Sequence, residues 1–217
     1  GASRFNTQGS FAAAATPRPV YFLHRGSDKT PGEEVIPGAL ACLTGLPPGF
    51  AELNPVDEGA RRAALARWIT DSRNPLTARS IVNRVWQYHF GRGIVDTPSD
   101  FGHQGSLPTH PELLDWLATD FVAHKFDVKR TARLILNSRV YQLSAAPTED
   151  NKHDKQNFAR YYARRMPAEV FLDAVNATCG VKGGFSGTSA NARAVDLPHE
   201  GFGSYFLDTF DRPKRVT

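Results

Sequence analysis

Seven polar residues whose side chains could do chemistry cluster along one stretch of the chain. They are His89, Arg92, Asp96, Asp100, His103, His110 and Glu112. Imidazoles and carboxylates are the ligand types that divalent transition metals prefer. A histidine with two carboxylates can also divide general-base and general-acid work without a metal. This set, called the polar cluster below, is therefore the first candidate for a functional site.

Within the polar cluster, the residue types suggest three roles. Four members are the candidate catalytic residues, namely Asp96, Asp100, His103 and His110. The last three of those four are also the candidate metal ligands. The other three members, His89, Arg92 and Glu112, are candidates for binding a ligand.

A structural interpretation of the same residues stands beside the chemical ones. Asp100 and Thr97 can form local turn hydrogen bonds, and His110 and Glu112 can cap a helix. His89 can complete the core face of its own helix. Spacing alone does not show whether these side chains converge, so a structural role, a metal site and metal-free chemistry all remain open.

Other known signatures are absent or incomplete. The run from Gly183 to Gly187 lacks the lysine of a P-loop and the spacing of a nucleophile elbow, and it indicates a flexible turn. His199 has no second histidine four residues later, which excludes a zincin helix. Cys42 and Cys179 form neither a CxxC nor a CxxCH motif, so we expect no haem in this chain, and a long-range disulfide or two reduced thiols both remain open.

Composition and charge indicate a folded protein. The chain has 217 residues, 41% of them hydrophobic, and a net charge of +4. That charge is modest for a nucleic-acid-binding domain, so nucleic acid is an unlikely partner. We expect most arginines to lie on solvated helix faces or to pair with Asp71, Asp115 and Asp120. The tryptophans Trp68, Trp86 and Trp116 lie on or beside apolar stripes, which favours core packing over sugar stacking.

Helical periodicity dominates the middle of the chain. Apolar residues at helical spacing predict a helix from Glu58 to Asp71, with a stripe that includes Leu65 and Ile69. Asn74 predicts the N-cap of a second helix that runs to Phe90 and ends at Gly91. The following loop, Gly91 to Pro108, is longer than the usual connection of about 4 to 6 residues, and such loops are often functional.

Further helices are expected after this loop. Thr109 and Glu112 have the spacing of a capping box, which predicts a helix with a stripe through Leu114, Leu117 and Phe121. Asp127 predicts the cap of a shorter helix that runs toward Ser138. Another helix is expected to open at residue 167 and to end at residue 180.

Two strand-like stretches occur near the ends, at residues 20–24 and 202–207, and they could pair with each other. We therefore predict a mainly α fold, with a helical bundle-like core, extended N- and C-terminal arms and a short two-stranded β pairing. The expected organisation is an extended arm at 1–55, a helical core at 56–180 and an irregular segment at 181–217 that packs on the core.

Three runs, residues 66–79, 83–102 and 108–117, are distinctive as sequence. They resemble the planctomycete cytochrome-linked family of unknown function, usually the C-terminal part of large exported bacterial proteins. Shorter matches at 21–26, 34–37, 138–141 and 164–173 extend the resemblance over most of residues 20–180. The resemblance implies a fragment of a larger, exported or periplasmic protein that carries haem c elsewhere, with no cofactor in this chain.

The family brings no established reaction, so the sequence leaves two hypotheses. The first is a soluble binding or scaffolding module, without a membrane span, that presents the loop from Gly91 to Pro108. Its partners would be other domains of the parent protein, a polysaccharide or another exported protein. The alternative is a catalytic domain that acts on complex carbohydrate through the polar cluster, with or without a metal.

Overall fold

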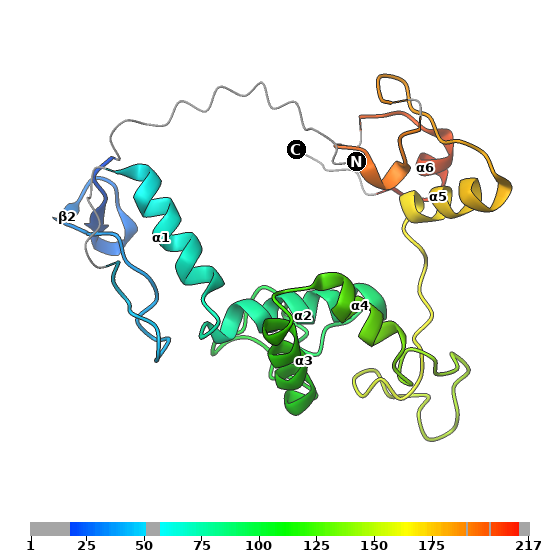
Figure 1. Ribbon diagram of the computed structural model, residues 1–217, viewed down its shortest axis with the longest axis horizontal. Coiled ribbons are helices and arrows are strands. Elements are labelled where there is room, and N and C mark those ends of the chain that lie inside the picture. The colour runs from blue at the N-terminus through cyan, green and yellow to red at the C-terminus, as the bar shows by residue number, and fades with distance from the viewer. Residues whose placement is uncertain (1–17, 51–56, 190, 200, 213–217) are drawn as a thin grey trace. The chain divides into compact units, whose positions relative to one another are not determined.

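The computed structural model in Figure 1 describes residues 18–50, 57–189, 191–199 and 201–212. The chain divides into two compact units, one ending at Tyr161 and the other beginning at Tyr162. Each unit is considered by itself below. The predicted extended arm lies partly outside the described residues, because residues 1–17 and 51–56 are not among them.

Helices are the main regular structure of the described residues. The first unit contains β1 (Tyr21–Leu23), the 3-10 helix η1 (His24–Gly26), β2 (Pro31–Glu34), α1 (Glu58–Thr70), α2 (Pro75–Phe90), α3 (Pro111–Ala123) and α4 (Val128–Leu136). The second contains α5 (Ala168–Cys179), the 3-10 helix η2 (Ala194–Asp196) and α6 (Tyr205–Thr209). The predicted mainly α fold with a short two-stranded sheet is confirmed.

The β pairing forms between different segments from those expected. β1 lies within the strand-like stretch at 20–24, but it pairs in antiparallel fashion with β2, so that Tyr21 faces Glu34. The second stretch, 202–207, was expected to extend as a strand, but its last three residues belong to the helix α6. Phe206 and Phe210 are four residues apart, which puts both rings on one helix face, and both lie against Phe171. The helical spacing of these aromatic residues therefore prevailed over their strand propensity.

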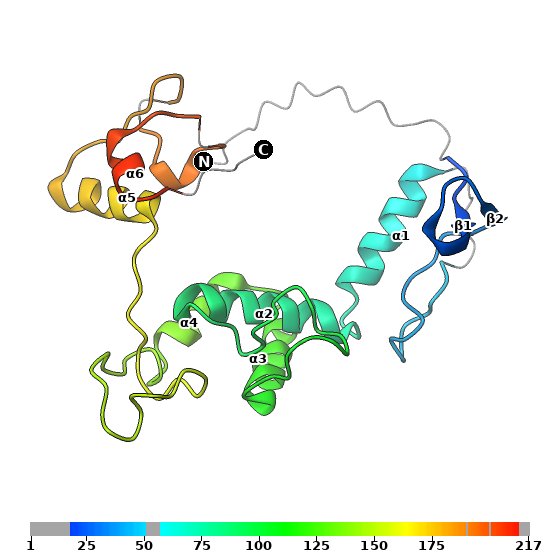
Figure 2. The same cartoon turned by 180° about the vertical axis from the view of Figure 1, so that it is seen from behind.

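The core of the first unit forms where α2, α3 and α4 pack together, and Figures 1 and 2 agree in placing these helices side by side. α2 contributes Val82, Trp86 and Phe90. α3 contributes the buried Leu114, Leu117 and Phe121 of its predicted stripe. Helix α4 contributes Ile135, which is 1% exposed. These three helices are the platform on which the loop between α2 and α3 lies.

Local capping signals predicted most helix ends correctly. The Asn74 side chain accepts hydrogen bonds from the backbone N–H groups of Leu76 and Thr77. Gly91 closes α2 with a φ of 83°, a left-handed conformation that glycine adopts without strain. Asp127 caps α4 by accepting a hydrogen bond from the Arg130 N–H.

The capping box expected at α3 is not present. The cap position is His110, and its side chain makes no capping hydrogen bond. The Thr109 N–H and hydroxyl both donate to the Ile94 carbonyl, at 2.9 and 3.3 Å, and Glu112 lies exposed in the first turn of the helix. Thr109 thus holds the preceding loop instead of the helix, because a carbonyl from a distant position competes for its donors.

Helix α1 forms where it was expected, but its apolar stripe is not buried. Leu65 and Ile69 are 45% and 42% exposed, and among the described residues none of α1 is buried. Trp116 on α3 is likewise 54% exposed, which corrects the prediction that it packs in the core. Amphipathic spacing predicted these helices and their faces, but it did not show whether a partner covers each face.

The second unit has a small core of its own. Ala168, Ala194 and Leu207 are buried together, and α5 packs against both η2 and α6. The Asp173 carboxylate on α5 accepts hydrogen bonds from the backbone N–H groups of Ala194 and Val195, at 2.7 and 3.1 Å. This carboxylate fixes η2 against α5, since it satisfies the first two N–H groups of η2.

Candidate functional site

The loop between α2 and α3 begins with a buried amide clamp. Asn83 on α2 is 0% exposed, and its Oδ1 accepts from the Val95 N–H at 2.8 Å while its Nδ2 donates to the Val95 carbonyl at 2.9 Å. One side-chain amide thus satisfies both backbone groups of a buried residue, as a neighbouring strand would. The clamp fixes the start of the loop on α2.

Gly93 is required by this clamp. A Cβ at this position would collide with the Val95 carbonyl oxygen and would lie 2.8 Å from both polar atoms of the Asn83 amide. Because the loop passes so close to the amide, no side chain fits there. The neighbouring Ile94 and Val95 are 0% and 1% exposed, so the loop is anchored by burial as well as by hydrogen bonds.

The second half of the loop is a turn held by Thr97 and Asp100. The Thr97 hydroxyl donates to the Asp100 carbonyl at 2.7 Å and accepts from the Ser106 N–H at 2.9 Å. The Asp100 carboxylate accepts from the Gly102 N–H at 2.8 Å. Asp100 therefore forms the local turn hydrogen bond that the structural interpretation of the polar cluster predicted.

Two further members of the polar cluster pair with each other. The Arg92 Nη2 donates to the Asp96 carboxylate at 2.8 Å, and its Nη1 donates to the Lys155 carbonyl at 3.1 Å. Arg92 thus joins the loop to the irregular segment that follows α4. This ion pair is partly exposed, so its main effect is positional rather than energetic.

Two histidines of the polar cluster contact oxygen atoms of residues close to them in the sequence. The His89 Nδ1 is 2.7 Å from the Val85 carbonyl on the same helix, and the His110 Nδ1 is 3.0 Å from the Thr109 hydroxyl. The His110 ring also lies 5.9 Å from the Phe158 ring. His103 is exposed and makes no hydrogen bond or ion pair within the described part of the chain.

Among the described residues, Arg92 and Asp96 are members of the polar cluster that pair directly with each other. In the part of the chain that the structure describes, no three His, Cys, Asp or Glu side chains are grouped closely enough to hold a metal ion. The proposed catalytic and metal-binding roles of the cluster stay predictions. What the structure does show is that Arg92, Asp96 and Asp100 help to hold the loop.

An aromatic cluster anchors the irregular segment between α4 and Tyr161. Trp86 and Phe90 stack with ring centroids 4.2 Å apart, and Phe158 lies edge-on to both, at 5.2 and 5.5 Å. Tyr141 lies edge-on between Phe90 and Tyr161, at 5.8 and 5.7 Å. Core packing of Trp86 is thus confirmed, and side chains rather than regular backbone pairing hold this segment in place.

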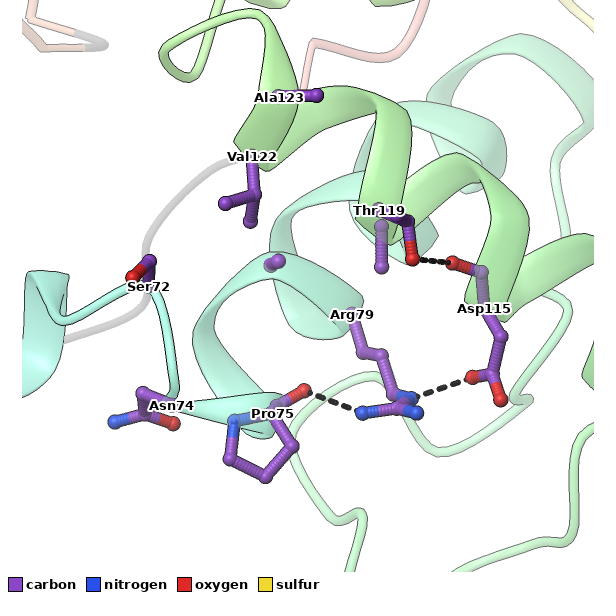
Figure 3. A pocket seen from close by; sticks show the side chains of 10 residues that line it. Ser72, Asn74, Pro75, Arg79, Asp115, Thr119, Val122 and Ala123 are labelled. Carbon is purple, nitrogen blue, oxygen red and sulfur yellow. Dashed lines mark hydrogen bonds and ion pairs between the residues drawn. The ribbon is translucent and has the colours of Figure 1, made fainter. Parts of the chain in front are cut away.

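A groove opens where the start of α2 meets the side of α3 (Figure 3). Its volume is about 300 Å³. It is lined by Ser72, Asn74, Pro75, Ala78, Arg79, Asp115, Ala118, Thr119, Val122 and Ala123. Three alanines among these residues leave room that larger side chains would fill.

One ion pair forms the polar rim of this groove. The Arg79 Nε donates to the Asp115 Oδ1 at 2.7 Å, and the Arg79 Nη1 donates to the Pro75 carbonyl at 3.0 Å (Figure 3). The Asp115 side chain is 55% exposed. Within the described residues, the Arg79 Nη2 and the Asp115 Oδ2 have no hydrogen-bond partner, so the rim offers a donor beside an acceptor.

The sequence contains only a partial signal for this groove. It predicted that Asp71, Asp115 and Asp120 pair with arginines, and the structure confirms the pairs with Arg73, Arg79 and Arg130. The concavity itself was missed, because it depends on small residues of two helices that face each other. Alanine spacing within one helix does not indicate which helix lies opposite.

The fold and these sites define a class of protein. It is a mainly helical domain in which side-chain hydrogen bonds hold the loop between α2 and α3, and in which an open groove lies between the same two helices. Residues 61–215 match the model of the PSD1 family, proteins of unknown function (DUF1553), and the chain belongs to this family. No curated protein and no solved structure matches the chain.

Proposed function

We propose that this chain is a binding module of a larger exported, cytochrome-linked protein, and that it binds a peptide segment of another domain in the groove between α2 and α3. The observation that carries the proposal is the groove itself, with a small-residue floor and an unpaired donor and acceptor on its rim. The exported setting and the haem domain elsewhere in the parent protein come from the sequence resemblance. No helix among the described residues is long and apolar enough to cross a membrane.

The loop from Gly91 to Pro108 supports binding over catalysis. An enzyme site needs catalytic side chains that converge on one reacting atom. Asp100 and Thr97 instead hold a turn, Asp96 pairs with Arg92, and His89 bonds within its own helix. Asp96, Thr97 and Asp100 thus hold the loop in shape, which is the arrangement expected of a scaffold.

The rim chemistry suits a peptide. A main-chain amide carries one N–H donor and one carbonyl acceptor, which complement the free Asp115 Oδ2 and Arg79 Nη2. The floor beneath, made of Ala78, Ala118 and Val122, would take one apolar side chain of the same peptide. Burial of such a side chain contributes about 1.5 to 3 kcal/mol, which is enough for a weak contact that covalent linkage in one parent protein would strengthen.

The proposal is tested by selecting random peptides on the folded chain and measuring the binding of the enriched peptides to two variants. Thr119→Trp places a large side chain at the groove, and we expect it to weaken binding at least about tenfold. Thr178→Trp on α5 is the matched control, because both hydroxyls are exposed and donate to the carbonyl four residues earlier at 2.8 Å. We expect the control to bind like the original chain.

Two results would contradict the proposal. Peptides that bind the Thr119→Trp variant as tightly as the original chain would show that the groove is not the site. If the original chain dimerises and Thr119→Trp abolishes the dimer, the groove is occupied by a second copy instead of a peptide from another domain.

A further inference from the structure

A second cavity lies within the C-terminal unit, and it differs in chemistry from the groove. Its volume is about 280 Å³, and it is formed by α5, the glycine-rich segment after α5 and the residues just before α6. It is lined by Leu172, Asn176, Lys182, Gly183, Gly184, Phe185, Gly203 and Ser204. The glycine-rich run that lacks a P-loop signature therefore forms part of a concave surface.

Several hydrogen-bond donors belong to the residues that line this cavity. Lys182 and the Asn176 side chain have no hydrogen-bond or ion-pair partner within the described residues. The backbone N–H groups of Gly183 and Gly184 also have no acceptor there. The Ser204 oxygen already accepts from the Leu207 N–H at 3.3 Å, which leaves its hydroxyl hydrogen available to donate.

The charged groups in and near the cavity also favour an anionic ligand. Lys182 is the only charged side chain among the described lining residues, and none of them carries a carboxylate. The nearby Asp173 carboxylate is engaged by the Ala194 and Val195 N–H groups. A described lining with one cation, several unpaired donors and no carboxylate favours an anionic ligand.

The glycines bring the backbone close to a ligand. A Cβ at Gly184 would have no atom within 4 Å, so the space beside this residue is open. A Cβ at Gly183 would lie 2.9 Å from the Ala192 carbonyl oxygen, so this residue must lack a side chain. Unpaired backbone N–H groups without side-chain bulk around them can donate charge-assisted hydrogen bonds to an oxyanion.

We propose that this cavity binds a tetrahedral oxyanion, the phosphate or sulfate group of a small polar molecule. The lining offers more donor groups than the two oxygens of a carboxylate can accept, and a group with three or four oxygens matches them better. A cavity of about 280 Å³ also exceeds the ion alone, since each water of the liquid occupies about 30 Å³. Room therefore remains for the molecule that carries the oxyanion. This site is independent of the groove in the helical core.

Inorganic phosphate and inorganic sulfate are the probes, titrated into the isotope-labelled full chain and followed by amide NMR, with sodium chloride at matched ionic strength. We expect saturable shifts of the Gly183 and Gly184 amides with at least one of the two anions. The anion that binds more tightly shows whether the ligand carries a phosphate or a sulfate group. Lys182→Gln should weaken binding at least about tenfold, because it removes one charge-assisted hydrogen bond. Lys129→Gln on α4, an exposed lysine outside the cavity, is the control with the same change of charge and should bind normally.

Shifts that chloride reproduces, or that do not saturate, would overturn the site. Equal binding by the Lys182→Gln variant with an otherwise unchanged spectrum would do the same. Tighter binding of acetate than of both tetrahedral anions would overturn the proposed ligand class. All of these readouts are independent of the peptide-binding experiment on the groove, so either proposal can fail alone.

Discussion

The buried amide of Asn83 shows how one side chain can determine the course of a long loop. It satisfies the N–H and the carbonyl of Val95 at once, and Val95 is 1% exposed. Buried backbone groups that lose such partners cost about 1 to 3 kcal/mol each. The position of the loop on α2 therefore depends on this residue more than on any member of the polar cluster.

Asn83→Ala should destabilise the chain by about 2 to 4 kcal/mol, since it orphans buried groups and leaves a small cavity. Chemical denaturation measures this change in the free energy of unfolding. Asn137→Ala, at an exposed position after α4, is the matched control and should change stability by less than about 0.5 kcal/mol. Similar losses for the two variants would show that the clamp contributes little.

Residue-scale signals were readable from the sequence only where their partners are close in the chain. Thr97 and Asp100 were expected to form turn hydrogen bonds, and they do. The Asn83 clamp was missed, because its partner lies 12 residues away and nothing local marks it. Thr109 was assigned to a capping box for the same reason, since its true acceptor, the Ile94 carbonyl, is 15 residues away.

At the scale of elements, the junction between α1 and α2 is held by a short-range ion pair. Arg73 donates to the Asp71 carboxylate from its backbone N–H, its Nε and its Nη2, at 2.8 to 2.9 Å. The Arg73 side chain first and its backbone N–H second lower the pKa of Asp71 from 3.8 to about 2. The junction therefore favours the charged form of the carboxylate in the folded state.

A pH dependence follows from this lowered pKa. Because the pKa of Asp71 is lower in the folded chain than in the unfolded one, its contribution to stability is complete above pH 3.8 and is lost as the pH falls toward about 2. In the Asp71→Asn variant, the denaturant concentration at the unfolding midpoint should therefore decrease less steeply as the pH falls from 3.8 to about 2. Asp150→Asn, an exposed control with the same change of charge, should leave the slope as it is. Equal slopes for the original chain and Asp71→Asn would contradict the assignment.

Element types were predicted better than element environments. The bounds of α1, α2, α4 and α5 follow from caps and periodicity, which act within one turn of helix. Exposure of Leu65 on α1 and of Trp116 on α3 did not follow, because burial depends on which surfaces meet. The groove between α2 and α3 was missed for the same reason.

At the scale of the whole molecule, the chain consists of two compact units with separate cores. The core of the first is centred on Val82, Trp86 and Phe121, and that of the second on Ala168, Ala194 and Leu207. Each core is composed of residues from its own unit. We therefore expect the two units to respond separately to core mutations.

Leu207→Ala should destabilise the second unit by about 2 to 5 kcal/mol, because Leu207 is 0% exposed. Hydrogen exchange should show faster exchange in α5 and unchanged protection in α2. Val195→Ala, at a residue that is 45% exposed, is the control and should leave both helices unchanged. Loss of protection in α2 together with α5 would show that the units unfold as one.

The positions of the three tryptophans give this chain an internal spectroscopic label. Trp68, Trp86 and Trp116 all precede residue 162, so indole emission reports on the first unit alone. Trp86 is 3% exposed and its Nε1 has no hydrogen-bond partner within the described residues, whereas Trp116 is 54% exposed. Short-wavelength emission should therefore come mainly from Trp86, long-wavelength emission from Trp116, and intermediate emission from the half-buried Trp68 on α1. A quencher dissolved in the solvent separates the emission of Trp86 from that of the more exposed tryptophans, so that loosening of the helices beneath the loop can be followed without any added dye.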